Sequence, residues 1–258
     1  MAGFQFVFTA NDCWNRLNLK TPKLKTIELY RMRRFFLLVG LAVWALAGCT
    51  MYEMPYDPGL DFMPLETGRY LIYDVTEQRY SLTAALTTTT YQLKETVGNP
   101  YTDVTGQTAF RLQRYRRPNA QTAWTTDSVW TARLTDRAAI RTENGIDFVK
   151  LQFPLAERDR WDGNQYNQLG EDTYQLRNLR GGYSVNGRAY GETAQVVQQD
   201  DSTLVSRDKR IEVYAKQIGL IYKETEQLQY CSAGACVGKA QIDFGVRRFV
   251  RLASYGKE

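Results

Sequence analysis

The chain has 258 residues, with 33 lysine and arginine residues, 28 aspartate and glutamate residues, and no histidine. The missing histidine excludes Ser-His-Asp and Cys-His nucleophilic sites and every zinc site that uses histidine. Residues 1–48 hold seven basic and two acidic residues, so the remainder carries 26 of each sign. This balance predicts no nucleic-acid partner.

The first organised segment is an apolar run at residues 35–47, which follows Arg33 and Arg34. The run is shorter than the roughly 20 residues that a membrane-spanning helix needs. A basic pair before a short apolar run is typical of a signal peptide, which we predict at residues 32–48. The alternative is a buried apolar helix. Residues 1–31 are then an upstream extension from a mis-called start, or an extended basic region of the signal peptide.

Leu46, Ala47, Gly48 and Cys49 resemble the lipobox of bacterial lipoproteins. The resemblance implies that the first three residues are recognised by a signal peptidase. It also implies cleavage before Cys49 and a diacylglyceryl group on its sulfur. Two acyl chains are enough for stable membrane attachment. We therefore expect a protein that is lipid-anchored to a membrane of the bacterial cell envelope, with its domain outside the cytoplasm.

Residues 49–64 contain three prolines and no hydrophobic periodicity, which predicts a lipidated tether. Residues 65–258 are predicted to form one β-rich globular domain, because short alternating runs are separated by polar turns. Asn144-Gly145 predicts a type I′ hairpin turn. Residues 198–202 are interpreted as a second turn, followed by a strand at 202–206. The expected fold is all-β, a mainly antiparallel barrel, half-barrel or sandwich of roughly 9–11 strands.

Cys231 and Cys236 are the only thiols left after removal of residues 1–48 and lipidation of Cys49. An even pair in a secreted domain favours a disulfide. A redox pair or a metal site is the alternative, although the spacing is not Cys-x-x-Cys and further metal ligands are missing. We expect no metal site and no cofactor.

Two groups of polar residues are candidate functional sites. Residues 162–167 resemble a calcium loop in their alternating oxygen ligands, but the sixth and twelfth positions do not fit. A turn capped by Asp and Asn side chains, with Trp161 packed on the core, is the favoured interpretation. The arginines at 111, 114, 116 and 117 are interpreted as a solvated hairpin face.

Two stretches carry a wider resemblance. They are Phe153-Pro154 with Trp-Asp-Gly-Asn-Gln-Tyr-Asn at 161–167, and Glu-Val-Tyr-Ala-Lys-Gln-Ile-Gly-Leu-Ile-Tyr-Lys-Glu at 212–224. Together with the lipobox they are similar to uncharacterised lipoproteins of Bacteroidota envelopes. The resemblance covers most of the mature chain, with Gln217 at a position where glycine is usual. It implies no activity and no site residues.

Three hypotheses for function remain open. The first is a non-enzymatic envelope lipoprotein that binds an apolar or glycan ligand, or a partner. The second is a structural or interaction module without a pocket. The third is a carboxylate-dependent hydrolase acting through one of three acidic pairs. These pairs are Glu171 and Asp172, Asp200 and Asp201, and Glu224 and Glu226. A catalytic role is the least favoured of the three.

Overall fold

The computed structural model describes residues 56–258, and within them the chain is almost entirely β-strand. In chain order the elements are η1 (Leu60–Phe62), β1 (Arg69–Tyr80), β2 (Thr87–Thr102), β3 (Thr108–Arg117), β4 (Thr125–Leu134), β5 (Ala138–Glu143), β6 (Ile146–Gln152), β7 (Arg160–Asp162), β8 (Thr173–Val185), β9 (Arg188–Ser202), β10 (Ser206–Ala215), β11 (Gly219–Tyr230), η2 (Gly234–Cys236) and β12 (Ile242–Lys257). No helix in this part of the chain has the length and apolar character that a membrane crossing requires.

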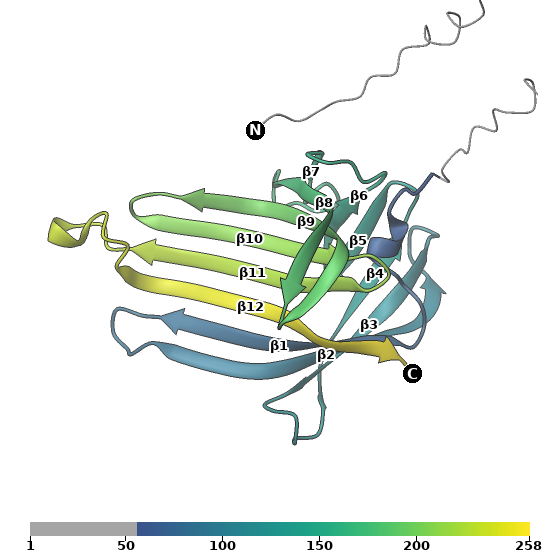
Figure 1. The fold of residues 1–258 in the computed structure, drawn as a ribbon, viewed down its shortest axis with the longest axis horizontal. Helices are drawn as coiled ribbons and strands as arrows, with labels where there is room; N and C mark the ends of the chain where they lie inside the picture. The colour runs from purple at the N-terminus through teal and green to yellow at the C-terminus, as the bar shows by residue number, and fades with distance from the viewer. Residues whose placement is uncertain (1–55) are drawn as a thin grey trace, which may run out of the picture. The chain divides into compact units, whose positions relative to one another are not determined.

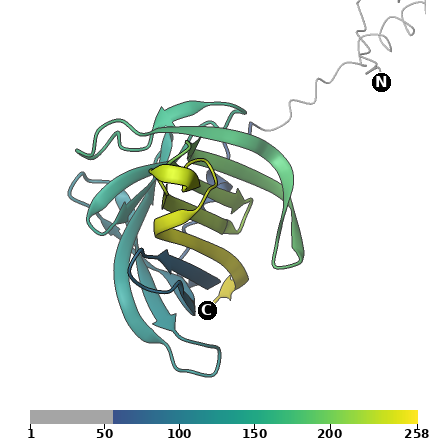
Figure 2. The same cartoon turned by 90° about the vertical axis from the view of Figure 1, so that its left-hand side faces the viewer.

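All twelve strands of the described residues belong to one antiparallel sheet in the order β6-β5-β4-β3-β2-β1-β12-β11-β10-β9-β8-β7. Two six-stranded meanders therefore meet where the first strand pairs with the last. Because sheets twist, a sheet of this size curls back on itself (Figures 1 and 2). At its two ends the Val149 N–H donates to Gly163 O at 2.9 Å, and Trp161 Nε1 donates to Val149 O at 2.9 Å. The result is a nearly closed barrel, which confirms the predicted all-β fold class.

Apolar side chains fill one end of the barrel interior and also cover part of its outer face. The interior cluster includes Phe62, Leu151, Trp161 and Leu176. On the outer face, the β8–β9 hairpin folds across β10–β12 (Figure 1). There Val185 and Tyr190 join the cluster of Ile211 and Val213, and Tyr183 lies 5.6 Å from the ring of Tyr222. One end of the interior is therefore closed by packing.

Residues 56–64, the described part of the expected tether at residues 49–64, pack against the domain. Phe62 is fully buried, and Met63 is buried beside it. The Gln217 N–H donates to Asp61 O at 2.7 Å, and Lys216 Nζ donates to Asp57 Oδ2 at 2.8 Å. These contacts hold η1 on the β10–β11 turn, and Phe62 and Met63 pack into the interior cluster. Residues 1–55 lie outside the described part of the chain, including the expected signal peptide and Cys49.

Two turn predictions have opposite outcomes. The Asn144-Gly145 turn between β5 and β6 is confirmed, with φ values of 54° and 82°. The turn expected at residues 198–202 is wrong, because β9 continues to Ser202 and the chain turns after it. The Thr203 hydroxyl accepts from the Ser206 N–H at 2.9 Å, so the tight turn lies within the segment that was expected to be a strand.

Candidate functional site

A cavity of about 490 Å³ opens on the inner face of the barrel, lined from β1–β5 and from β10–β12. Because side chains alternate along strands, every second residue of these strands faces it. The six basic side chains of the lining are Arg79, Arg114, Arg116, Arg141, Lys223 and Arg248. The five acidic side chains of the lining are Glu77, Glu95, Asp127, Glu143 and Glu212. The cavity is therefore polar and highly charged.

The floor of the cavity is a buried ion-pair network. Lys150 Nζ lies 3.0 Å from Glu143 Oε1 and 3.2 Å from Glu212 Oε1. Lys223 Nζ lies 2.7 Å from the same Glu212 oxygen, and the Tyr214 hydroxyl donates to the other at 2.6 Å. Lys150 is 3% exposed and Glu212 is 1% exposed. Buried charges are costly unless paired, so this network requires all its members.

The network keeps its groups charged at neutral pH. Burial raises the pKa of Glu143, but the nearby cations Lys150, Lys223 and Arg141 outweigh burial and lower that pKa to about 2. The same balance between burial and the two lysines holds the pKa of Glu212 well below its usual range. Burial lowers the pKa of Lys150, and its two carboxylate partners reverse this and raise it. Neither carboxylate is therefore a proton donor at neutral pH, as a glycosidase acid must be.

A second layer of the cavity is organised around Trp130. Arg141 Nη2 lies 2.6 Å from Glu95 Oε2, and Arg114 Nε lies 3.5 Å from the same oxygen. The Arg114 guanidinium carbon is 3.6 Å from the centre of the Trp130 ring, and that of Arg141 is 5.3 Å away. These cation–π contacts occupy the aromatic surface with guanidinium groups. The wall here is therefore cationic.

Two arginines meet at Tyr91 in the outer part of the cavity. The Arg116 guanidinium carbon lies 3.8 Å from the centre of the Tyr91 ring, and Arg248 Nη2 donates to the Tyr91 hydroxyl at 2.9 Å. Arg79, which also lines the cavity, is paired with Glu77 at 2.7 Å. Among residues 56–258 no carboxylate lies within 4 Å of the Arg116 guanidinium.

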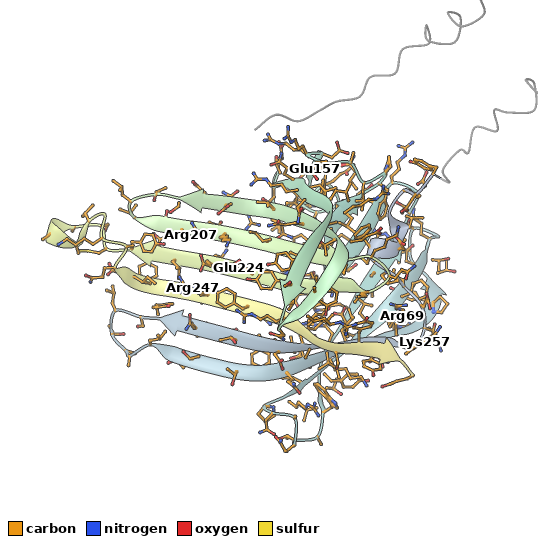
Figure 3. All side chains as sticks on the ribbon, in the orientation of Figure 1. Arg69, Glu157, Arg207, Glu224, Arg247 and Lys257 are labelled. Atoms are coloured by element: carbon orange, nitrogen blue, oxygen red, sulfur yellow. A yellow bond between two sulfur atoms is a disulfide. The ribbon has the colours of Figure 1, made fainter. Side chains whose placement is uncertain are left out.

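The three acidic pairs that are candidates for a hydrolase lie outside the cavity. None of their six residues lines the cavity. Glu226 contacts Arg207 at 2.7 Å and Arg247 at 2.5 Å, and Glu224 contacts Lys209 at 2.9 Å. Figure 3 labels Arg207, Glu224 and Arg247, which come from the neighbouring strands β10, β11 and β12. These residues form cross-strand ion pairs, which are a usual feature of sheets.

The predicted cysteine pair and the predicted turn after Trp161 lie within the described residues, and the lipobox does not. Cys231 and Cys236 lie at disulfide distance in the β11–β12 loop, with Cα atoms 5.8 Å apart. Trp161 is buried against Tyr174, as expected, with ring centres 6.1 Å apart. Asp162 Oδ1 accepts from the Asn164 N–H at 2.9 Å, so this carboxylate caps its turn. Leu46, Ala47, Gly48 and Cys49 lie outside the described residues.

Sequence reasoning missed the cavity residues. Arg114 and Arg116 belong to the run that was interpreted as a solvated face, yet both line the cavity. Their spacing of two was the available signal, because alternate residues of a strand share a face. Lys150 alternates with the apolar residues Val149 and Leu151, which places it on the opposite face of its strand. A bulge in the β5–β6 pairing leaves Lys150 without a partner in the ladder, and its side chain is buried.

Comparisons with known proteins assign no family. No protein-family model matches the chain, and no curated protein matches it. A solved structure that is similar is that of a predicted exported protein with a YmcC-like fold from Bacteroides fragilis. Its TM-score is 0.39 and its sequence identity 12%, over 76% of this chain and 99% of that chain. A similarity of this extent carries no argument about function.

Proposed function

We propose that this chain is a lipid-anchored lipoprotein of a bacterial cell envelope whose β domain binds a small polar ligand and performs no catalysis. The observation that carries the binding role is the charged cavity of about 490 Å³ in the barrel interior. Cavities of this size are typical of small-molecule sites. The polar lining favours a glycan or another polar ligand over the apolar ligand that the sequence left open.

The cost of the lining supports binding over a purely structural role. Apolar side chains fill the barrel interior around Phe62 and Trp161, and the same packing could have continued into the cavity. The chain instead places paired charges there, although desolvation costs several kcal/mol per buried ion. A barrel selected only for stability gains nothing from this arrangement. A binding site gains charged groups that can recognise the polar groups of a ligand.

The state of the carboxylates supports binding over catalysis. Glu143 and Glu212 share Lys150, and both have pKa values far below neutrality. Two facing carboxylates of a hydrolase need one raised pKa, because one group must deliver a proton. Here the lysines hold both groups ionised, which suits fixed recognition of hydroxyl or cationic groups.

The anchoring part of the proposal rests on the lipobox residues Leu46, Ala47, Gly48 and Cys49. We expect radiolabelled fatty acid to label the wild-type protein, and Cys49→Ser to abolish the label and release the protein from membranes. Absence of label on the wild type would remove the anchor from the proposal. The binding role of the domain is tested separately.

Native mass spectrometry of the protein from its own cells tests the binding role. We expect a small molecule to remain bound and to be released on denaturation. Thr89 lines the cavity and Thr88 does not, so Thr89→Trp should remove the bound mass and Thr88→Trp should keep it. If the wild-type protein carries no small molecule while still folded, the structural-module hypothesis replaces this proposal.

A further inference from the structure

The cations around the cavity outnumber the carboxylates. Six basic and five acidic side chains line it, and Lys150 behind the floor adds a seventh cation. The excess is two positive charges in a domain whose sequence is otherwise nearly balanced. A cavity lined by an excess of positive charge attracts an anionic ligand.

The excess charge lies at two arginines, Arg116 and Arg248, which we call the Tyr91 arginine pair. Arg116 lies over the ring face of Tyr91, and Arg248 donates to its hydroxyl. Arg248 Nε is buried and has no hydrogen-bond partner within residues 56–258. The nearest carboxylate, Glu77, is 4.0 Å from this nitrogen and is paired with Arg79 at 2.7 Å. Both guanidinium groups therefore keep donors that the protein does not use.

We propose that the Tyr91 arginine pair binds a phosphate group of the ligand, an assignment that rests on the proposed binding function. A phosphate monoester carries close to two negative charges at neutral pH, which matches the excess in the cavity. Guanidinium groups bind phosphate oxygens through parallel N–H donors. Arg116 lies over the ring of Tyr91 and Arg248 contacts its hydroxyl, so the two guanidinium groups approach from different sides. A tetrahedral phosphate presents oxygens in several directions and can therefore contact both.

The rest of the lining identifies the part of the ligand that adjoins the phosphate. The hydroxyls of Thr89, Ser128 and Thr225 and the charged floor at Glu143 and Lys223 all face the cavity. These groups hydrogen-bond to hydroxyls, and the arginines occupy the faces of Tyr91 and Trp130. The ligand class is therefore a phosphate ester of a polyhydroxyl compound. A soluble sugar phosphate or glycerol phosphate has this chemistry as a monoester, and a phospholipid headgroup has it as a diester with one negative charge.

Titration of the mature chain with inorganic phosphate and with glycerol 3-phosphate tests the assignment. The indole N–H resonance of Trp130 is the reporter, assigned with Trp130→Phe, and sodium chloride of equal ionic strength is the reference. We expect saturable shifts with both phosphates. Arg116→Gln and Arg248→Gln should each weaken binding about tenfold, which corresponds to one charge-assisted hydrogen bond. Arg111→Gln should stay within about twofold, because Arg111 stacks on Tyr101 outside the cavity.

Vesicles distinguish the two sources of the phosphate. Cosedimentation uses vesicles of phosphatidylglycerol and of phosphatidylcholine, with the Cys49→Ser chain so that the lipid anchor contributes nothing. Binding to phosphatidylglycerol vesicles that Arg116→Gln weakens about tenfold supports a lipid headgroup. Binding of glycerol 3-phosphate without vesicle binding supports a soluble ester.

Three results would overturn the assignment. They are a phosphate response equal to that of chloride, equal losses in Arg111→Gln and Arg116→Gln, and acetate binding as tightly as phosphate. If native mass spectrometry still finds a bound neutral molecule that Thr89→Trp removes, only the phosphate assignment fails. If no bound molecule is found either, the proposed binding function fails with it.

Discussion

Replacing Glu212 by glutamine tests whether the buried ion pairs hold the barrel interior together. Glu212 accepts from Lys150, Lys223 and the Tyr214 hydroxyl, and it is 1% exposed. Glutamine has nearly the same shape, so Glu212→Gln removes the negative charge and little packing. It leaves Lys150 buried with Glu143 as its remaining carboxylate partner.

The expected magnitude follows from this loss of charge balance. Breaking a buried ion pair by removing one partner costs about 3–5 kcal/mol, because the other charge stays buried without compensation. Glu143 still lies 3.0 Å from Lys150, and Lys223 is partly exposed. The loss should therefore lie near the low end, at about 3 kcal/mol. With a urea m value of about 2 kcal/mol/M, the unfolding midpoint should fall by roughly 1.5 M.

Urea unfolding at neutral pH, followed by tryptophan fluorescence, measures this shift. The matched control is Glu66→Gln, because Glu66 is exposed and its partner Lys257 lies 3.1 Å away on the surface. Exposed ion pairs contribute little, so the midpoint of this variant should stay where it is in the wild type. If Glu212→Gln and Glu66→Gln unfold at the same urea concentration as the wild type, the network does not stabilise the domain.

Two further predictions concern acid and the cysteine pair. The pKa of Glu143 is about 2 in the folded domain, below its ordinary 4.5. The contribution of its charge to the free energy of unfolding is therefore complete above pH 4.5 and is lost as the pH falls through 2. As the pH is lowered from about 5 to about 3, the urea concentration at the unfolding midpoint should decrease, and it should decrease less in Glu143→Gln. An equal decrease in both proteins would contradict the low pKa of Glu143. Replacing Cys231 and Cys236 together by serine should cost about 2 kcal/mol, since the disulfide closes a short loop. A native-like thermal midpoint in that variant would show that no disulfide forms.

The strands could be predicted because their signals are local. Alternation and the Asn144-Gly145 pair depend on neighbouring residues, and β5 and β6 formed as expected. The turn prediction at residues 198–202 was wrong because it also depended only on neighbouring residues. Asp200 and Asp201 are typical of turns, but here they occupy a strand, where Asp200 lies 3.4 Å from Arg207. Local composition does not distinguish a polar strand from a loop.

The cavity could not be predicted, because it joins residues far apart in the sequence. Lys150 of β6 meets Glu212 of β10, 62 residues later, and this requires the sheet to curl until its ends approach. The arginine run on β3 shows the same limit. Its spacing divides Arg111 from Arg114 and Arg116, but both faces of the strand are charged. Only the pairing of all twelve strands determines which face is inside.

The segment before β1 shows how composition can conceal packing, and Phe62 provides the test. Three prolines predicted a tether, yet Phe62 is fully buried in the interior cluster, whereas Leu60 on the same short helix is 37% exposed. Truncation of a buried phenylalanine costs about 3–5 kcal/mol through lost burial and the cavity left behind. Phe62→Ala should therefore lower the urea midpoint far more than Leu60→Ala does. If the two variants unfold together, the segment is the tether that the prolines suggested, and the barrel end is closed without it.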